Sequence, residues 1–157
     1  MNWEQVCAHP SLTDLPFKIE LDEYGKIVMN AVRVSHALYQ GEIEFLLRSL
    51  LKTGKAIPVC AIKTRKGTKV ADVAWACPKT VERIRHETQC SVSPEICVEV
   101  MYLTNTHEEM EEKKTLYFEN GAREFWICKD GTMSFYDRNG WLKKSVMVPE
   151  FPDFVEI

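Results

Sequence analysis

The sequence lacks the features that mark membrane-spanning, secreted and repeat proteins. Its longest apolar runs are much shorter than the roughly 20 residues that a membrane-spanning helix needs. The N-terminal segment has no basic region followed by an apolar core, so no secretory signal peptide is expected. There are no internal repeats, low-complexity tracts or linker-like stretches, and we therefore expect a single domain covering residues 1–157.

Cysteines spaced for metal binding are also missing. The six cysteines form no C-x-x-C pair and no cysteine–histidine doublet, which argues against a zinc site or a disulfide scaffold. Cys60, Cys97 and Cys128 each fall inside an apolar strand pattern, where a free thiol packs as a small hydrophobic group. We interpret the cysteines as reduced residues of a cytoplasmic protein.

Positive charge is not in excess. The formal net charge is −3 at pH 7, which disfavours a large surface built to contact phosphates. A local basic patch stays open as an alternative to a solvated loop. The candidate residues form two clusters, namely Lys63, Arg65, Lys66 and Lys69, and Lys79, Arg83, Arg85 and His86.

Helix and strand patterns alternate along the chain, which predicts an α+β (mixed α/β) fold with a central mixed β-sheet flanked by helices. Strands are expected at 17–21, 26–30, 57–63, 69–75, 94–103, 123–129, 133–136 and 141–148, the first two forming a hairpin. Helices are expected at 2–9, at 36–53 and between 106 and 121, whereas 79–87 fits either a short charged helix or an ordered loop. The proline-broken tail at 149–154 is expected to lie over the body of the protein.

Four residues are predicted to mark helix ends. Ser35 is the expected N-cap of the second helix, and Gly54 is its expected C-terminal stop. Thr106 with Glu109 has the spacing of a capping box for the third helix.

Two predicted strands each carry one acid among apolar residues. Asp72 lies in the middle of K-V-A-D-V-A-W, and Glu99 lies in the middle of P-E-I-C-V-E-V-M. If the strands are neighbours and these faces coincide, the two carboxylates converge, and each pKa would rise unless a cation sits between them. Carboxylate oxygens are the ligands that Mg²⁺ and Mn²⁺ prefer, so a divalent cation is the usual solution.

The helix after the Glu99 strand supplies positive charge. Helical spacing places Lys113 slightly closer than Lys114 to the inward stripe of Met110 and Tyr117. Two plainer interpretations remain: both lysines can extend to water, or Lys113 can form a purely structural buried ion pair with Glu99.

These segments resemble the Uma-type putative restriction endonucleases of the PD-(D/E)xK nuclease superfamily. The resemblance rests on the Asp72 strand, on the Glu99-Val100 strand and on Lys113 placed four residues before Tyr117. It continues through the run G-A-R-E-F-W-I and, upstream, through I-E-L before Gly25 and S-H at a helix start, so it spans most of the chain. The resemblance implies a restriction-endonuclease-like core.

The sequence departs from the family pattern at four places. The proline that usually precedes the aspartate is Ala71, and Met101 stands where the superfamily has a lysine that this family takes from the helix instead. The family's serine after the E-V-x run is Tyr102, and 103–105 lacks the usual proline.

The resemblance also implies an activity and a site. The expected reaction is Mg²⁺-dependent hydrolysis of phosphodiester bonds in DNA, with Mn²⁺ as a substitute ion, by a homodimer that cuts both strands. Asp72, Glu99 and the backbone carbonyl of Val100 would hold the metal, and Lys113 would position the attacking water or stabilise charge. Accessory roles fall to Glu20, as an outer carboxylate or an additional ligand, and to His36, which either touches phosphate or simply begins its helix.

Two further points complete these expectations. Glu124 is left outside catalysis, either pairing at the surface or holding Lys113 in place. The main alternative to an endonuclease is a catalytically weak or inactive nuclease-fold protein that acts as a nucleic-acid-binding or protein-binding module.

Overall fold

The computed structural model describes all 157 residues and contains two sheets. The larger sheet has six strands in the order β3-β4-β5-β6-β7-β8, and all neighbours are antiparallel except β5 and β6, which are parallel. Its strands are β3 (Lys55–Thr64), β4 (Gly67–Ala76), β5 (Ile96–Val100), β6 (Glu124–Lys129), β7 (Thr132–Asp137) and β8 (Gly140–Leu142). The smaller sheet is the predicted hairpin of β1 (Phe17–Leu21) and β2 (Ile27–Ala31). The six-stranded sheet is therefore mixed, as the sequence predicts.

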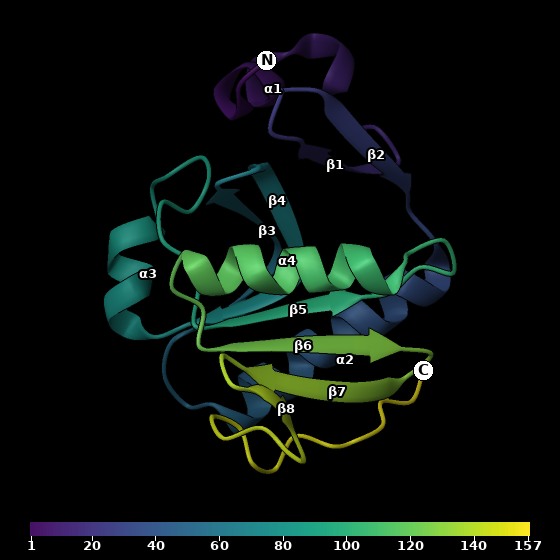
Figure 1. The fold of residues 1–157 in the computed structure, drawn as a ribbon, viewed down its shortest axis with the longest axis vertical. Coiled ribbons are helices and arrows are strands. Elements are labelled where there is room, and N and C mark those ends of the chain that lie inside the picture. The colour runs from purple at the N-terminus through teal and green to yellow at the C-terminus, as the bar shows by residue number, and fades with distance from the viewer.

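Helices cover both faces of the six-stranded sheet (Figure 1). Helix α2 (Val34–Leu50) packs on one face, where Ile43 and Leu47 join a core that includes Trp126 and Phe151. Helices α3 (Pro78–Ile84) and α4 (His107–Glu119) lie on the other face, where Tyr117 joins a second core. The short α1 (Trp3–Ala8) and the 3₁₀ turn η1 (Pro10–Leu12) lie beyond the hairpin. These layers confirm the predicted α+β architecture with helices on both sides of the sheet.

Local signals placed several elements correctly. The capping box at α4 forms as predicted, because the Thr106 side chain accepts a hydrogen bond from Glu109 N while the Glu109 carboxylate accepts one from Thr106 N. Residues 78–84 form a helix rather than a loop, with Pro78 at the first helical position, where its missing N–H is not needed. The tail crosses the body as expected, with Phe151 and Val155 buried.

The predicted ends of α2 were wrong. The helix begins at Val34, and the N-cap is Arg33 in an extended conformation without a capping side chain, so Ser35 lies inside the first turn. The apolar pattern did not mark this turn because Val34 is exposed. The helix ends at Leu50, and Gly54 instead occupies the following turn with φ of 74°, where a Cβ atom would collide with the Ala76 carbonyl oxygen.

The strand predicted at 141–148 is also shorter than expected. Strand β8 pairs with β7 only over three residues, and the chain then leaves the sheet. The segment that follows is held by hydrogen bonds from Ser145 Oγ and from the N–H groups of Val146 and Met147 to the buried Glu124 carboxylate, in place of strand pairing.

The β1–β2 hairpin packs across the end of the sheet nearest the β3–β4 turn. Gly67, at φ of 89°, lies so close to the hairpin that a Cβ atom there would collide with the carbonyl oxygens of Leu21 and Asp22. The Val70 N–H on β4 donates a hydrogen bond of 2.6 Å to the Glu20 carboxylate on β1. This docking brings the charged side chains of β1 over the middle of β4.

None of the helices is both long and apolar enough to cross a membrane.

Candidate active site

Asp72 and Glu99 lie side by side on neighbouring strands. Strands β4 and β5 are antiparallel, and their register pairs Val73 with Val98. Asp72, just before Val73, therefore lies opposite Glu99, just after Val98. Both are 2% exposed. Asp72 Oδ2 also accepts a hydrogen bond of 2.7 Å from Val100 N, which fixes the carboxylate at the end of β5.

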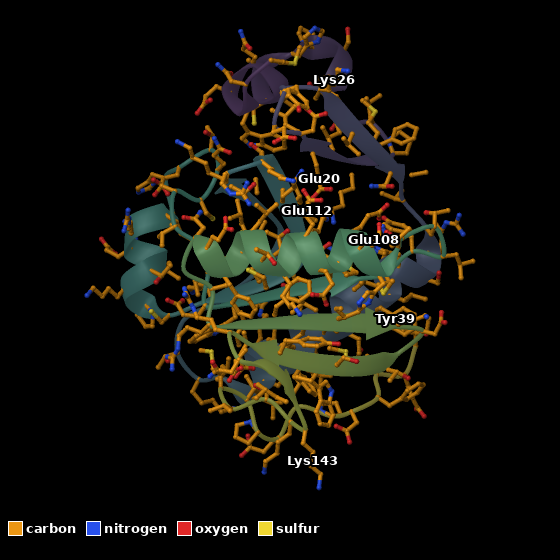
Figure 2. All side chains as sticks on the ribbon, in the orientation of Figure 1. Glu20, Lys26, Tyr39, Glu108, Glu112 and Lys143 are labelled. Atoms are coloured by element: carbon orange, nitrogen blue, oxygen red, sulfur yellow. The ribbon has the colours of Figure 1, made fainter.

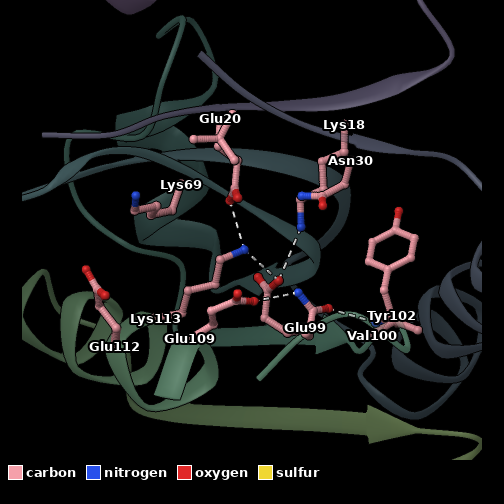
Figure 3. A pocket seen from close by; sticks show the side chains of 12 residues that line it. Lys18, Glu20, Asn30, Lys69, Glu99, Val100, Tyr102, Glu109, Glu112 and Lys113 are labelled. Atoms are coloured by element: carbon pink, nitrogen blue, oxygen red, sulfur yellow. Dashed lines mark hydrogen bonds and ion pairs between the residues drawn. The ribbon is translucent and has the colours of Figure 1, made fainter. Parts of the chain in front are cut away.

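Lys113 reaches this pair from α4. Its Nζ lies 3.0 Å from Glu99 Oε1 and 2.9 Å from Glu20 Oε2 (Figure 3). Lys114 points elsewhere, because it pairs with Glu111 and lies over the Tyr136 ring. The structure thus brings together the three residues that the sequence singled out, and it places Glu20 beside them.

His36 is buried against the same two strands. Its Nε2 lies 3.0 Å from the Val100 carbonyl oxygen and 3.3 Å from Asp72 Oδ2. A carbonyl oxygen can only accept, so Nε2 carries the hydrogen in this contact. The Tyr102 ring stacks on the imidazole, with centroids 4.1 Å apart and planes 7° apart. His36 therefore does more than begin α2.

The sequence reasoning missed Lys18, which lies at the centre of the cluster. Its Nζ lies 3.0 Å from Asp72 Oδ1 and 3.2 Å from Glu99 Oε1, and its side chain is 8% exposed. The signal was present, because residues two apart on a strand share a face and Lys18 stands two residues before Glu20 on β1. Tyr117 was interpreted only as a core residue, yet its hydroxyl donates a hydrogen bond of 3.0 Å to Glu99 Oε2.

The electrostatic balance differs between the three carboxylates. Burial alone would raise the pKa of Asp72, but Lys18 and His36 lower it to about 2. Burial likewise opposes ionisation of Glu20, yet the attraction of Lys113 and Lys18 holds the pKa of Glu20 below its usual value. Complete burial raises the pKa of Glu99 despite the two lysines, and the like charges of Asp72 and Glu20 add to that rise.

The Lys18 ammonium does not behave as a buried neutral lysine would. Burial would lower the pKa of Lys18, but attraction to Glu99 and Asp72 outweighs it and raises that pKa above the usual value. Lys18 is therefore a fixed positive charge inside the cluster.

The cluster opens into a cavity of about 240 Å³. Figure 3 shows the acidic and basic side chains of β1, β5 and α4 pointing into this space from three sides. A second cavity of about 350 Å³ adjoins it, since Val100, Tyr102 and Asn105 line both. Basic side chains border each cavity, with Lys69 at the first and Arg33 and Lys129 at the second.

The donor atoms suit a hard divalent cation, although Lys18 already contacts two of them. Asp72 and Glu99 lie on neighbouring strands, and carboxylate oxygens are the donors that Mg²⁺ and Mn²⁺ prefer. The Lys18 ammonium, however, lies within hydrogen-bonding distance of one oxygen of each carboxylate, and the Val100 carbonyl oxygen is in contact with His36. No group of three acidic, histidine or cysteine side chains is arranged to hold an ion without rearrangement.

Glu124 lies apart from this site, contrary to both positions expected for it. It is buried beneath the C-terminal segment, where its carboxylate accepts hydrogen bonds from Trp126 Nε1, Ser145 Oγ and the N–H groups of Val146 and Met147. It therefore anchors the chain that follows β8.

Comparison with known proteins gives a family and a similar fold. The family model Uma2, described as "Putative restriction endonuclease", matches residues 3–156. A solved structure of a putative nuclease belonging to DUF820 from Anabaena variabilis ATCC 29413 superposes with a TM-score of 0.65 at 15% sequence identity, covering 85% of this chain and 73% of that chain. The search of curated proteins gave no match. The fold, the cluster of acidic and basic residues and the family match over nearly the whole sequence lead to one conclusion: the chain belongs to the Uma2 family of putative restriction endonucleases.

Proposed function

We propose that the protein is a Mg²⁺-dependent endonuclease that hydrolyses phosphodiester bonds in DNA. The observation that carries this proposal is one cluster of Glu20, Asp72, Glu99 and Lys113 in a chain of this family. Glu20, Glu99 and Lys113 of this cluster line an open cavity. The four residues of the cluster come from β1, β4, β5 and α4, so four separate segments of the chain supply one site.

Asp72, Glu99 and the backbone carbonyl of Val100 would hold the ion. A bound Mg²⁺ would polarise the scissile phosphate and lower the pKa of a water molecule. The Val100 N–H bond to Asp72 and the Tyr117 hydroxyl bond to Glu99 keep both carboxylates oriented.

Lys113 would act on the substrate directly. Its ammonium is held by Glu20 and Glu99 at the wall of the cavity, where it can donate a hydrogen bond to a phosphate oxygen or to the attacking water. Negative charge builds on the phosphoryl oxygens in the transition state, and a positioned ammonium stabilises that charge more than it stabilises the ground state. Glu20 is then the positioning residue for Lys113.

The surroundings fit a nucleic acid that passes across both cavities. Lys69, Arg33 and Lys129 can neutralise phosphates on either side of the cleavage position.

Cutting both strands of a duplex calls for two active sites, which a symmetric homodimer provides. The six free cysteines are consistent with a reducing, cytoplasmic setting.

A second candidate is a nuclease-fold module that binds nucleic acid or a protein without cutting. The contacts of Lys18 with Asp72 and Glu99 favour it, because they balance the buried carboxylates without any metal. The presence or absence of metal-dependent cleavage separates the two functions.

Nicking of supercoiled plasmid in Mg²⁺ or Mn²⁺ tests the proposal, with EDTA as the metal-free arm and an RNA transcript as the alternative substrate. The wild type should nick the plasmid, and Asp72→Ala and Lys113→Ala should reduce the rate by at least about 100-fold. Lys143→Ala is the matched control, because Lys143 is exposed and lies at the opposite end of the molecule from Glu20 (Figure 2). Cleavage that survives in both variants, or cleavage of the RNA alone, would overturn the assignment.

A further inference from the structure

We propose that the Lys18 ammonium competes with the divalent cation for Asp72 and Glu99, so that metal enters the site only when the Lys18 side chain leaves it. This inference rests on the proposed function, since it concerns how the same site is loaded. It makes Lys18 a regulator of metal affinity.

The competition follows from shared acceptor atoms. Lys18 Nζ donates to Asp72 Oδ1 and to Glu99 Oε1, the two oxygens that a bridging cation would use. The other oxygen of each carboxylate has a separate donor, namely the Val100 N–H for Asp72 and the Tyr117 hydroxyl for Glu99. An ion that bridges the pair must therefore use the oxygens that Lys18 contacts.

The cluster is already complete without an ion. No buried side-chain nitrogen or oxygen lacks a hydrogen-bond partner, and Lys18 supplies the partner that Asp72 Oδ1 would otherwise lack. A metal-free carboxylate pair at this depth would carry a large desolvation penalty without such a cation. Lys18 thus stabilises the metal-free state, and a metal must overcome that stabilisation.

The net charge of the cluster favours replacement of the Lys18 ammonium by a divalent cation over addition of the cation beside it. With all three carboxylates ionised and His36 left aside, the three carboxylates and two ammonium groups give the buried cluster one net negative charge. A divalent cation added to this set would reverse the charge, whereas a divalent cation that replaces Lys18 makes the cluster neutral. Because excess buried charge is costly, the exchange is the more stable outcome.

Lys18 also has a route out of the site. It lies on the two-stranded sheet, which is not part of the six-stranded sheet that holds Asp72 and Glu99. Its side chain lines the 240 Å³ cavity together with Val28 and Asn30 of β2. A lysine has four rotatable side-chain bonds, so its ammonium can turn into this space while β1 stays paired.

Mn²⁺ titration, with free ion followed by its electron paramagnetic resonance signal, tests the competition. Lys18→Met, which keeps an unbranched side chain one heavy atom shorter and removes the charge, should bind Mn²⁺ at least ten times more tightly than the wild type. Lys18→Arg keeps the charge and should bind no more tightly than the wild type, and Lys143→Met is the control for a lost surface charge. Asp72→Asn in the Lys18→Met background should abolish the gain.

A second measurement needs no variant of Lys18. An amine-specific acylating ester, with peptides mapped by mass spectrometry, reports how exposed each lysine of the wild type is. Saturating Mn²⁺ should raise the labelling of Lys18 several-fold and leave that of the exposed Lys143 unchanged. A labelling rate of Lys18 that does not respond to Mn²⁺ would overturn the proposal even if Lys18→Met fails to fold.

The outcomes also separate this inference from the proposed function. Equal Mn²⁺ affinity in the wild type and in Lys18→Met, together with plasmid nicking by both, would refute the competition and leave the nuclease assignment standing. Failure of every protein, including Lys18→Met, to bind Mn²⁺ would overturn both.

Discussion

The Glu20 carboxylate on β1 lies 2.9 Å from the Lys113 ammonium on α4. This contact links the N-terminal hairpin to the helix that carries the proposed catalytic lysine. Lys18 makes a second link, from the same strand to Asp72 and Glu99. The hairpin therefore supplies two of the five charged groups in the cluster, and the site is incomplete without it.

Loss of the Glu20 charge should slow cleavage without removing the site. In Glu20→Gln the Lys113 ammonium loses one of its two anionic partners, so its position becomes less defined. We expect kcat for plasmid nicking to fall by roughly 10–100-fold with little change in KM, as for residues that orient a metal-site ligand. Glu23→Gln, in the exposed hairpin turn, is the matched control. A Glu20→Gln rate equal to that of the wild type would contradict the positioning role.

Loss of the Glu124 charge should affect stability and not chemistry. Each of its two oxygens accepts two hydrogen bonds, and the amide of Glu124→Gln would turn one end into a donor facing two other donors. Hydrogen bonds to charged groups contribute about 1.5–3 kcal/mol each, so we expect the free energy of unfolding to fall by about 3 kcal/mol. For a chain of this size that corresponds to a decrease in Tm of roughly 5–15 °C.

Urea denaturation and calorimetry measure these changes in Glu124→Gln. Glu150→Gln, an exposed acid on the same C-terminal segment, should behave as the wild type. Nicking activity per folded molecule should be unchanged in both variants. A Glu124→Gln protein as stable as the wild type would show that the carboxylate does not anchor the segment.

The stability that Asp72 contributes should depend on pH. The folded protein holds the pKa of Asp72 at about 2, below the value near 3.8 of an unperturbed aspartate. A carboxyl group with a lowered pKa in the folded state stabilises the protein fully above its unfolded pKa, and this contribution is lost as the pH falls from about 4 towards 2. The shift corresponds to a contribution on the order of 2 kcal/mol.

Urea unfolding of the wild type and of Asp72→Asn, repeated between pH 6 and pH 2.5, measures this dependence. The difference in free energy of unfolding should be largest above pH 4 and should shrink in more acidic solution. A difference that stays constant across this range would mean that the pKa of Asp72 is not lowered in the folded protein.

Two buried thiols should form a disulfide under oxidising conditions. Cys60 Sγ on β3 lies 3.5 Å from Cys90 Sγ, although no spacing motif along the chain indicates a cysteine pair. The Cys60 thiol lowers the pKa of Cys90 by hydrogen bonding to it, and the thiolate is the form that attacks in thiol oxidation. Treatment with diamide should therefore cross-link these two residues before any other pair, as seen in peptide maps.

Cys90→Ser is the control for this cross-link, and it should lose the Cys60–Cys90 peptide while the remaining cysteines stay free. Cross-linking of Cys60 or Cys90 mainly to Cys97 would show that the thiols are arranged differently.

Most of the fold could be predicted because it rests on local signals. Alternating apolar residues gave the strands, and the Thr106–Glu109 capping box gave the start of α4. The start of α2 was mispredicted because Val34 is exposed and so does not belong to the buried apolar stripe of the helix. The length of the last strand was mispredicted because the buried Glu124 binds the segment after β8, and a buried acid does not follow the rule that apolar residues lie inside.

The sequence by itself singled out Asp72 and Glu99, since each is a lone acid in an apolar strand, and helical spacing together with the family resemblance added Lys113. Only the tertiary structure decided what lies between the carboxylates. Lys18 is 54 residues from Asp72 and 81 residues from Glu99 along the chain, and its position depends on how the hairpin docks on β4. That docking is set by long-range packing at Gly67 and by the Val70–Glu20 hydrogen bond, which no local pattern encodes.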